Sequence, residues 1–166
     1  IDALGREWQI STVQLDFIQP ARFKLEYVAE DGSKKTPVMI HRALIGSPDR
    51  FLGILIEHYA GAFPLWLAPV QVKVLPIGEA HQDFALSVSE QLKAAGIRAE
   101  LDVSNESLGK KIRTVKTEKI SAWLVIGDKE VEAQAAALEH RDGTKDEPRP
   151  ISEIITALKA QISERR

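Results

Sequence analysis

Residues 37–71, PVMIHRALIGSPDRFLGILIEHYAGAFPLWLAPVQ, decide how the first part of the chain folds. Residues 38–42 are apolar and partly β-branched, which predicts a mostly buried strand that carries His41. The residues after this strand predict a helix with Arg50 in its first turn. A histidine on a strand and an arginine at the start of the next helix together suggest a site for a nucleotide and a metal ion.

The predicted helix has its own start and stop signals. Ser47 is an N-cap candidate, Pro48 suits the first helical position, and Asp49 complements the helix dipole. Gly61 is a candidate stop signal. The apolar face of the helix is formed by Phe51, Leu52, Leu55, Ile56 and Tyr59. An arginine beside a helix N-terminus favours binding of a phosphate group or an adenine ring.

Both side chains also have simpler explanations. A single histidine in a hydrophobic strand is more often a hydrogen-bonded core residue than a metal ligand. Arg50, taken alone, is more often one partner of an ion pair on a helix surface. The residues by themselves leave both interpretations open.

The chain before residue 37 predicts antiparallel strands. Between residues 8 and 17 apolar and polar side chains alternate as on a strand. One face would hold Val13, Leu15 and Phe17, and the other Thr12, Gln14 and Asp16. Residues 23–27 resume the strand pattern, and Asp31 and Gly32 form a turn signal. We predict a three-stranded antiparallel sheet, whose polar face either lines a cavity or faces solvent.

After residue 70 the pattern changes to alternating strands and helices, so we divide the chain into residues 1–70 and 71–166. The predicted elements are strands at 70–75, 97–103, 122–126 and 130–140, and helices at 80–95, from Asn105 to Lys119, and from Ser152 onward. Asn105 and Ser152 are the expected caps of the last two helices. This is α/β order with mainly parallel strand pairing.

The composition is that of an ordinary globular protein. With 44% hydrophobic residues, 28% charged residues and a net charge of −2, the chain can bury a core but is not a general polyanion binder. Any nucleic-acid contact must therefore be local. Cysteine is absent, no apolar run reaches membrane-spanning length, and no signal or transit segment opens the chain. We expect a cytoplasmic protein that does not enter a membrane.

Five stretches carry a resemblance to a known family: GREWQISTVQLDF (5–17), PVMIHRALIGSPDRF (37–51), GILIEHYAGAFPLWLAPVQ (53–71), IRAELDVSNESLGKKIR (97–113) and LVIGDKE (124–130). They are spread over residues 5–130 and resemble class II aminoacyl-tRNA synthetases, a resemblance that extends over essentially the entire chain. The histidine of MIHRA, beside the motif 3 arginine, points to the threonyl-tRNA synthetases within that class. The resemblance implies an α+β fragment of the antiparallel class II catalytic sheet, with the helix from Ser47 packed against it. An α/β anticodon-binding domain with a mixed, mainly parallel sheet is expected to follow.

The resemblance also implies an activity. Threonyl-tRNA synthetases use ATP with Mg²⁺ to convert L-threonine to threonyl-adenylate and then transfer the threonyl group to tRNA(Thr). Motifs 1 and 2 of the class are not found in these residues, so we expect that this chain alone does not activate threonine. By the same resemblance the full-length protein is expected to be a homodimer.

For the first part of the chain, the resemblance assigns individual roles. Gln14, Ser47 and Arg50 match substrate-binding and catalytic positions, and Gln9, Thr12 and Arg50 match ATP-binding positions. His41 matches one of three protein ligands of a zinc ion, whose other two ligands, a cysteine and a histidine, lie outside this chain. Zinc in this family binds the amino and hydroxyl groups of threonine, and a metal that requires the hydroxyl rejects valine strongly.

For the second part, the resemblance assigns anticodon contacts to Asn105, Arg113 and Glu130, with Lys111 as a supporting phosphate contact in the anticodon-binding site. Residues 104–119 also carry Lys110, Lys116 and Lys119, which together form a local basic patch or, as a simpler explanation, a solvated helix face. Among the departures from the family pattern, Ser104 and Glu139 replace arginines. We expect Arg141 or Lys145 to compensate for the anticodon contact that is lost at Glu139.

Two other functions fit parts of the sequence. A different class II synthetase, such as the prolyl or histidyl enzyme, shares the anticodon-binding domain, but the MIHRA and FPLWLAP segments argue against it. A non-catalytic protein that binds tRNA or mRNA would keep the fold. It would have no need for Gln14, His41 and Arg50.

Overall fold

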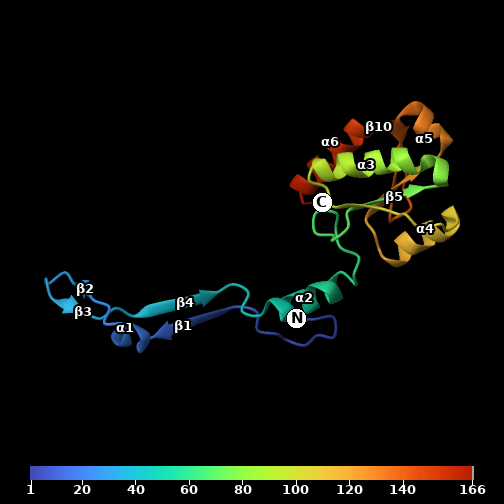
Figure 1. Cartoon of the computed structure of the whole chain (residues 1–166). Coiled ribbons are helices and arrows are strands. Elements are labelled where there is room, and N and C mark those ends of the chain that lie inside the picture. Colours follow the sequence, from blue (N-terminus) through green and yellow to red (C-terminus); the bar gives the residue numbers. More distant parts are fainter. Residues whose placement is uncertain (166) are drawn as a thin grey trace. The chain divides into compact units, whose positions relative to one another are not determined.

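The structure, a computed structural model, describes residues 1–165 and contains two compact units, Ile1–Tyr59 and Ala60–Arg166 (Figure 1). We predicted a division near residue 70, but the two units divide after Tyr59. Residues 60–70 pack on the second unit, where Leu65 joins the buried core. The guanidinium group of Arg98 holds the same segment by donating to the carbonyl oxygens of Trp66 and Ala68, at 2.8 and 2.9 Å.

The first unit is built on one antiparallel strand pair. Strand β1 (Thr12–Asp16) pairs with β4 (Met39–Ala43), and Gln14 lies directly opposite His41. A short helix, α1 (Gln19–Arg22), and a separate hairpin of β2 (Tyr27–Val28) and β3 (Lys34–Lys35) connect the two strands.

The predicted three-stranded sheet is wrong. Within residues 1–59 the strands form two separate pairs. The expected strand at 23–27 is interrupted because Phe23 caps α1 and Lys24 has a left-handed backbone, with φ of 53°. The turn at Asp31 and Gly32 is present, with Gly32 at φ of 77°.

The alternation predicted for β1 is present, but its apolar face is not covered by other described residues. Val13, Leu15 and Ile40 are 62%, 60% and 65% exposed. The expectation of a mostly buried strand at 38–42 is therefore wrong for this chain by itself, because a two-stranded pair has no layer of its own to pack against. The opposite face carries Gln14, Asp16 and His41.

Helix α2 (Pro48–His58) begins as predicted. Ser47 is its extended N-cap residue, and Asp49 lies in its first turn. The expected packing of α2 against a three-stranded sheet is not found. The side chain of Arg50 instead contacts residues 8 and 9, which precede β1.

The second unit has a four-stranded sheet in the order β6-β5-β7-β9. Its strands are β5 (Val72–Pro76), β6 (Ala99–Leu101), β7 (Ala122–Ile126) and β9 (Leu138–His140). The first three are parallel, and β9 is antiparallel to β7. This arrangement confirms the predicted mixed sheet.

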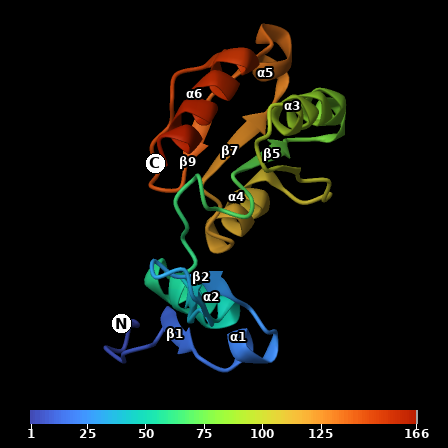
Figure 2. The ribbon, with the colours of Figure 1, turned by 90° about the vertical axis from the view of Figure 1, so that its left-hand side faces the viewer.

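Helices cover both faces of this sheet. Helices α3 (Gln82–Ala94) and α6 (Ile151–Ser163) lie on one face, and α4 (Leu108–Thr117) lies on the other (Figure 2). The alternation of strand side chains explains this, because Val74 and Leu124 pack with α3 and α6, whereas Leu75 and Trp123 pack with Val115 of α4.

Two predicted helix starts in the second unit are wrong. Helix α4 begins at Leu108 rather than after Asn105, and Ser107, in an extended conformation, takes the N-cap position. Helix α6 begins at Ile151, so Ser152 lies inside it. Pro150, which has an extended backbone conformation, lies directly before the first residue of α6.

Residues 130–140 are not one strand. They contain the end of α5 (Asp128–Ala133), strand β8 (Ala135–Ala136) and all of β9. Helix α5 starts at Asp128 because the side chain of Glu130 accepts the backbone N–H of the N-cap residue Gly127, at 2.9 Å. Strand β8 pairs with β10 (Arg149–Pro150), and a short 3₁₀ turn, η1 (Glu79–His81), precedes α3.

Candidate functional site

The first unit has a shallow hollow of about 240 Å³ beside the start of α2. It is lined by Gln9, Ile10, Ser11, Thr12, Gln14, Gly46 and Arg50. Three residues that we matched to ATP-binding positions, Gln9, Thr12 and Arg50, therefore line one concave surface. Ser47 lies at the edge of this region, where its Oγ accepts the backbone N–H of Arg50 at 3.4 Å.

Arg50 is held in place by two contacts with the segment before β1. Its Nη1 donates to the carbonyl oxygen of Gln9 at 2.9 Å, and its guanidinium carbon lies 5.6 Å from the ring centroid of Trp8. Among residues 1–165 no carboxylate pairs with Arg50. The surface ion pair that was the simpler explanation is therefore not formed, and the charge of Arg50 remains available to a bound anion.

A buried carboxylate supports this arrangement. The side chain of Asp2 is 1% exposed and accepts hydrogen bonds from Trp8 Nε1 at 2.7 Å and Arg6 Nε at 2.6 Å. The hydrogen bond from Trp8, with further ones from Arg6 and Leu4, outweighs desolvation and holds the pKa of the Asp2 carboxyl well below its usual range. The contacts that Asp2 and Trp8 make beside Arg50 were not predicted, because no spacing signal in the sequence connects these residues with Arg50.

His41 faces a second hollow, of about 600 Å³, in the same unit. The hollow is lined by Gln14, Leu15, Asp16, Phe17, Ile18, Gln19 and His41. The half-exposed imidazole of His41 places Nε2 3.0 Å from Asp16 Oδ2. The other oxygen of Asp16 accepts the backbone N–H groups of Ile18 and Gln19, both at 2.9 Å.

These contacts keep Asp16 ionised. The backbone N–H groups of Gln19 and Ile18, followed by the His41 ring, lower the pKa of the Asp16 carboxyl from its ordinary value. An ionised carboxylate is a strong acceptor for an imidazole N–H. Asp16 was placed correctly on the polar face, but its pairing with His41 was not predicted.

The chain offers a metal ion one histidine rather than a complete site. In the part of the chain that the structure describes, no group of three or more histidine, aspartate or glutamate side chains is placed to hold a metal. His41 Nδ1 has no hydrogen-bond partner among those residues. An imidazole whose other nitrogen is held by a carboxylate fits the usual form of a metal-ligating histidine. The residues present therefore fit a shared site in which this chain supplies one ligand.

Gln14 connects the two hollows. It lines the Arg50 hollow and the His41 hollow, and it lies opposite His41 in the β1–β4 register. Its amide group can thus reach a molecule that extends from one hollow to the other.

In the second unit, the candidate residues gather at the carboxyl edge of the parallel strands. Helix α3 follows β5 on one face of the sheet, whereas α4 follows β6 on the other (Figure 2). Neighbouring strands whose connections leave to opposite faces create a crevice at their carboxyl ends, a common place for ligands. The exposed Asn105 lies in the loop after β6, and Glu130 lies in the first turn of α5 after β7.

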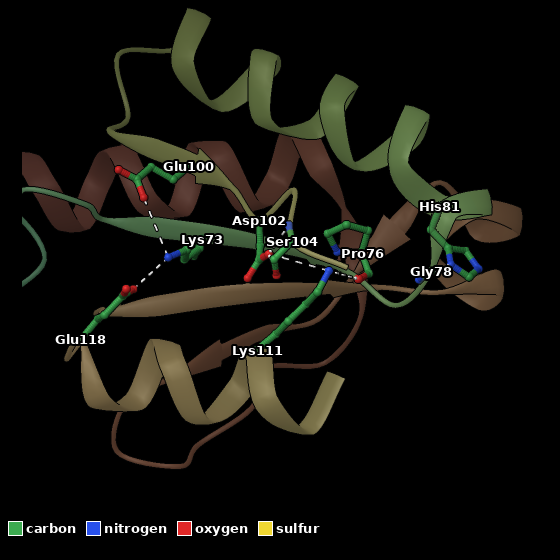
Figure 3. Close-up of polar contacts among 9 residues, drawn as sticks. All are labelled: Lys73, Pro76, Gly78, His81, Glu100, Asp102, Ser104, Lys111 and Glu118. Carbon is green, nitrogen blue, oxygen red and sulfur yellow. Dashed lines mark hydrogen bonds and ion pairs between the residues drawn. The ribbon is translucent and has the colours of Figure 1, made fainter. Parts of the chain in front are cut away.

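Lys111 does not fit its predicted role as a phosphate contact. Its side chain is 4% exposed, and its Nζ donates to the carbonyl oxygen of Pro76 at 3.0 Å and lies 3.8 Å from Asp102 Oδ1 (Figure 3). Burial raises the pKa of Asp102, but hydrogen bonds from Ser104 and the charges of Lys111 and Lys73 lower it further, so that it lies below its ordinary value. Lys111 therefore ties α4 to the ends of β5 and β6.

Replacing Lys111 by alanine is expected to lower the free energy of unfolding of the second unit by about 1–3 kcal/mol, because the buried Pro76 carbonyl loses its partner. Urea denaturation followed by circular dichroism measures this change. The neighbouring Lys110→Ala variant is the control, since Lys110 is exposed and pairs only with Glu106. Equal stability of both variants would contradict the structural role of Lys111.

The predicted basic patch is smaller than the sequence suggested. Lys119 donates to the carbonyl oxygen of Ala60, and Lys110 pairs with Glu106 at 2.7 Å. Arg113 and Lys116 are exposed, and neither forms an ion pair within residues 1–165. Arg113 is therefore free to contact a nucleic acid, whereas Glu130 uses one carboxylate oxygen to cap α5.

The charge of Glu139 is balanced by a neighbouring lysine rather than by an arginine. Its carboxylate accepts Trp123 Nε1 at 2.9 Å and pairs with Lys145 Nζ at 2.7 Å. Arg141 instead donates to the carbonyl oxygens of Ala62, Phe63 and Lys119. Arg141 is therefore committed to the segment at the start of the second unit, and Lys145 is paired with Glu139. Compensation for the anticodon contact by either residue stays a prediction.

Family models match both units of the chain. Residues 71–161 match the anticodon binding domain, and residues 1–59 match the tRNA synthetase class II core domain (G, H, P, S and T). The chain belongs to the anticodon-binding domain family of class II tRNA synthetases. Its first unit is a class II core segment.

Curated relatives of this synthetase segment are threonine–tRNA ligases. The chain is 52% identical to the enzyme of Paenarthrobacter aurescens over 99% of its own length and 24% of that protein. The enzyme of Gloeobacter violaceus is also 52% identical, over 99% of this chain and 26% of the relative. The chain thus spans about a quarter of the length of these relatives.

Solved structures agree with the family. The RNA-binding domain of threonyl-tRNA synthetase from Cryptosporidium parvum superposes with a TM-score of 0.84 at 35% identity, covering 96% of this chain and 40% of that one. Prolyl-tRNA synthetase from the same organism gives 0.72 at 24% identity, over 97% of this chain and 35% of that one, which shows a shared fold. Within residues 1–165, no helix is both long and apolar enough to cross a membrane.

Proposed function

We propose that this synthetase segment is part of a threonine–tRNA ligase, to which it contributes one side of the aminoacylation site and the anticodon-reading domain. The observation that carries this proposal is the position of Gln14. It lines both the Arg50 hollow and the His41 hollow, in a chain that is 52% identical to threonine–tRNA ligases along nearly all its length. A molecule with a nucleotide end and an amino-acid end fits these two hollows.

In the first step, the carboxylate oxygen of threonine attacks the α-phosphorus of Mg²⁺-bound ATP. The new C–O–P bond gives threonyl-adenylate, and the bond between the α-phosphorus and the bridging oxygen breaks to release pyrophosphate. Arg50 stabilises the phosphate charge, while Gln9 and Thr12 line the adenylate side and Ser47 begins the helix beside it. The amide of Gln14 can donate to the reacting carboxylate.

His41 is the residue of this chain that would hold zinc. Zinc held by His41 and by two ligands outside this chain would supply a Lewis acid for the amino and hydroxyl groups of threonine, and so would exclude valine, which lacks the hydroxyl. His41 contributes one neutral imidazole nitrogen, and Asp16 holds the ring. Confinement of threonine next to Gln14 orients its carboxylate toward the Arg50 hollow.

In the second step, a terminal ribose hydroxyl of tRNA(Thr) attacks the threonyl carbonyl carbon. The bond between that carbon and the phosphate oxygen breaks, and AMP leaves. The anticodon would lie at the carboxyl edge of the second sheet, where Asn105, Arg113 and Glu130 reach single-stranded bases through amide, guanidinium and carboxylate groups. The homodimeric state and cytoplasmic location expected for the full-length protein belong to the same proposal.

An aminoacylation assay with the complete protein tests this function. We expect it to charge tRNA(Thr) with threonine and to reject valine by at least about 10⁴-fold in kcat/KM. We also expect that the 166-residue chain alone gives no threonine-dependent pyrophosphate exchange. Charging with another amino acid would contradict the proposed substrate, and exchange by the chain alone would contradict its dependence on missing segments.

A further inference from the structure

We propose that Asp16 is a positioning residue that fixes the tautomer of His41, so that Nδ1 is the nitrogen presented to the metal. This inference rests on the proposed zinc-dependent function. It concerns a residue for which neither the sequence motifs nor the comparisons provide a role. Its basis is the arrangement of Asp16, His41 and the turn that follows β1.

The carboxylate of Asp16 is rigidly held. Its Oδ1 accepts the N–H groups of both Ile18 and Gln19, so this oxygen closes the turn at the end of β1. Rotation of the carboxylate would break both bonds. The remaining oxygen, Oδ2, is therefore directed at His41 Nε2 by the backbone itself, at 3.0 Å.

This fixed acceptor selects one form of the imidazole. A carboxylate only accepts hydrogen bonds, so a neutral His41 ring must carry its proton on Nε2. The lone pair then lies on Nδ1, which has no partner among residues 1–165. A metal requires that lone pair, and a carboxylate on the other ring nitrogen both orients the ring and makes it a stronger ligand.

Asp16→Asn is a sharp test because it preserves the shape of the side chain. The amide oxygen of asparagine must face Ile18 and Gln19, since both backbone groups are donors. The amide NH₂ group therefore faces His41 and donates to Nε2, which moves the ring proton to Nδ1. We expect zinc affinity of the complete synthetase to fall about 10–100-fold, as measured by competition with a chromophoric chelator.

A spectroscopic measurement separates positioning from a general loss of structure. In the metal-free 166-residue chain with ¹⁵N-labelled histidine, we expect His41 to be protonated at Nε2 in the natural sequence and at Nδ1 in Asp16→Asn. Asp16→Glu keeps a carboxylate and is expected to restore the Nε2-protonated form. The control is Asp31→Asn, because Asp31 also accepts a backbone N–H two residues ahead, from Ser33, but has no contact with His41.

The outcomes distinguish the inference from the function on which it rests. Weakened zinc binding together with the proton shift supports the role of Asp16. Unchanged zinc affinity in Asp16→Asn, with zinc present in the natural enzyme, overturns that role and leaves the proposed function intact. A natural enzyme that contains no zinc overturns both the zinc assignment and this inference.

Discussion

Replacing His41 by alanine in the complete synthetase is expected to abolish stoichiometric zinc and to lower kcat/KM for threonine activation about a thousandfold. The zinc falls away because one of three protein ligands is lost, a larger change than the loss of a supporting hydrogen bond. A thousandfold decrease corresponds to about 4 kcal/mol of transition-state stabilisation, the scale expected when a metal that holds the substrate is removed. Metal analysis and threonine-dependent pyrophosphate exchange measure the two effects.

The matched control for this variant is His58→Ala. His58 is exposed at the end of α2, where its ring packs edge-on against the ring of Tyr59. We expect that variant to keep both zinc and activity. Full zinc content in the His41→Ala enzyme would show that this histidine is not a ligand, whatever the activity.

Replacing Trp123 by alanine is expected to lower the free energy of unfolding of the second unit by about 3–5 kcal/mol. The side chain is 2% exposed and packs with Leu75, Val115 and Ile120 between β7 and α4. Its indole N–H also donates to Glu139, which would keep only Lys145. Because whole domains are stable by about 5–15 kcal/mol, this one change removes a large share.

Chemical denaturation of the chain, followed by far-ultraviolet circular dichroism, measures that loss. Leu86→Ala is the control, since Leu86 is 47% exposed on α3 and its truncation is expected to change stability by no more than about 0.5 kcal/mol. Trp123→Phe fills most of the space and is expected to fall between the two. A similar stability for all three variants would contradict the packing described for α4.

Local patterns predicted the elements well where neighbours in sequence determine the structure. The start of α2 follows from Ser47 and Pro48, and the polar face of β1 follows from simple alternation. The strand at 122–126 was predicted with the same bounds that the structure gives to β7. Prediction failed where a later residue took the cap position, as Ser107 does in place of Asn105, or where a positive φ interrupted a strand, as at Lys24.

The candidate site was predictable in its members but not in their partners. Gln9, Thr12 and Arg50 were matched to one function by resemblance, and they line one hollow. Lys111 was matched to a supporting phosphate contact by resemblance, yet it is buried against Pro76 and Asp102. Lys111 is buried because α4 packs beside the ends of β5 and β6. The sequence of α4 alone does not specify that packing.

The sequence by itself determined which residue types stand on which face of each strand and helix, because the periods of 2 and 3.6 residues are local properties of the backbone. It also determined the family, through motifs that are spread over residues 5–130. Only the tertiary structure decided that Asp16 holds His41, that Asp2 and Trp8 support Arg50, and that Lys145 neutralises Glu139. These contacts form when separate segments meet, and their strength depends on burial and on distances that no single segment specifies.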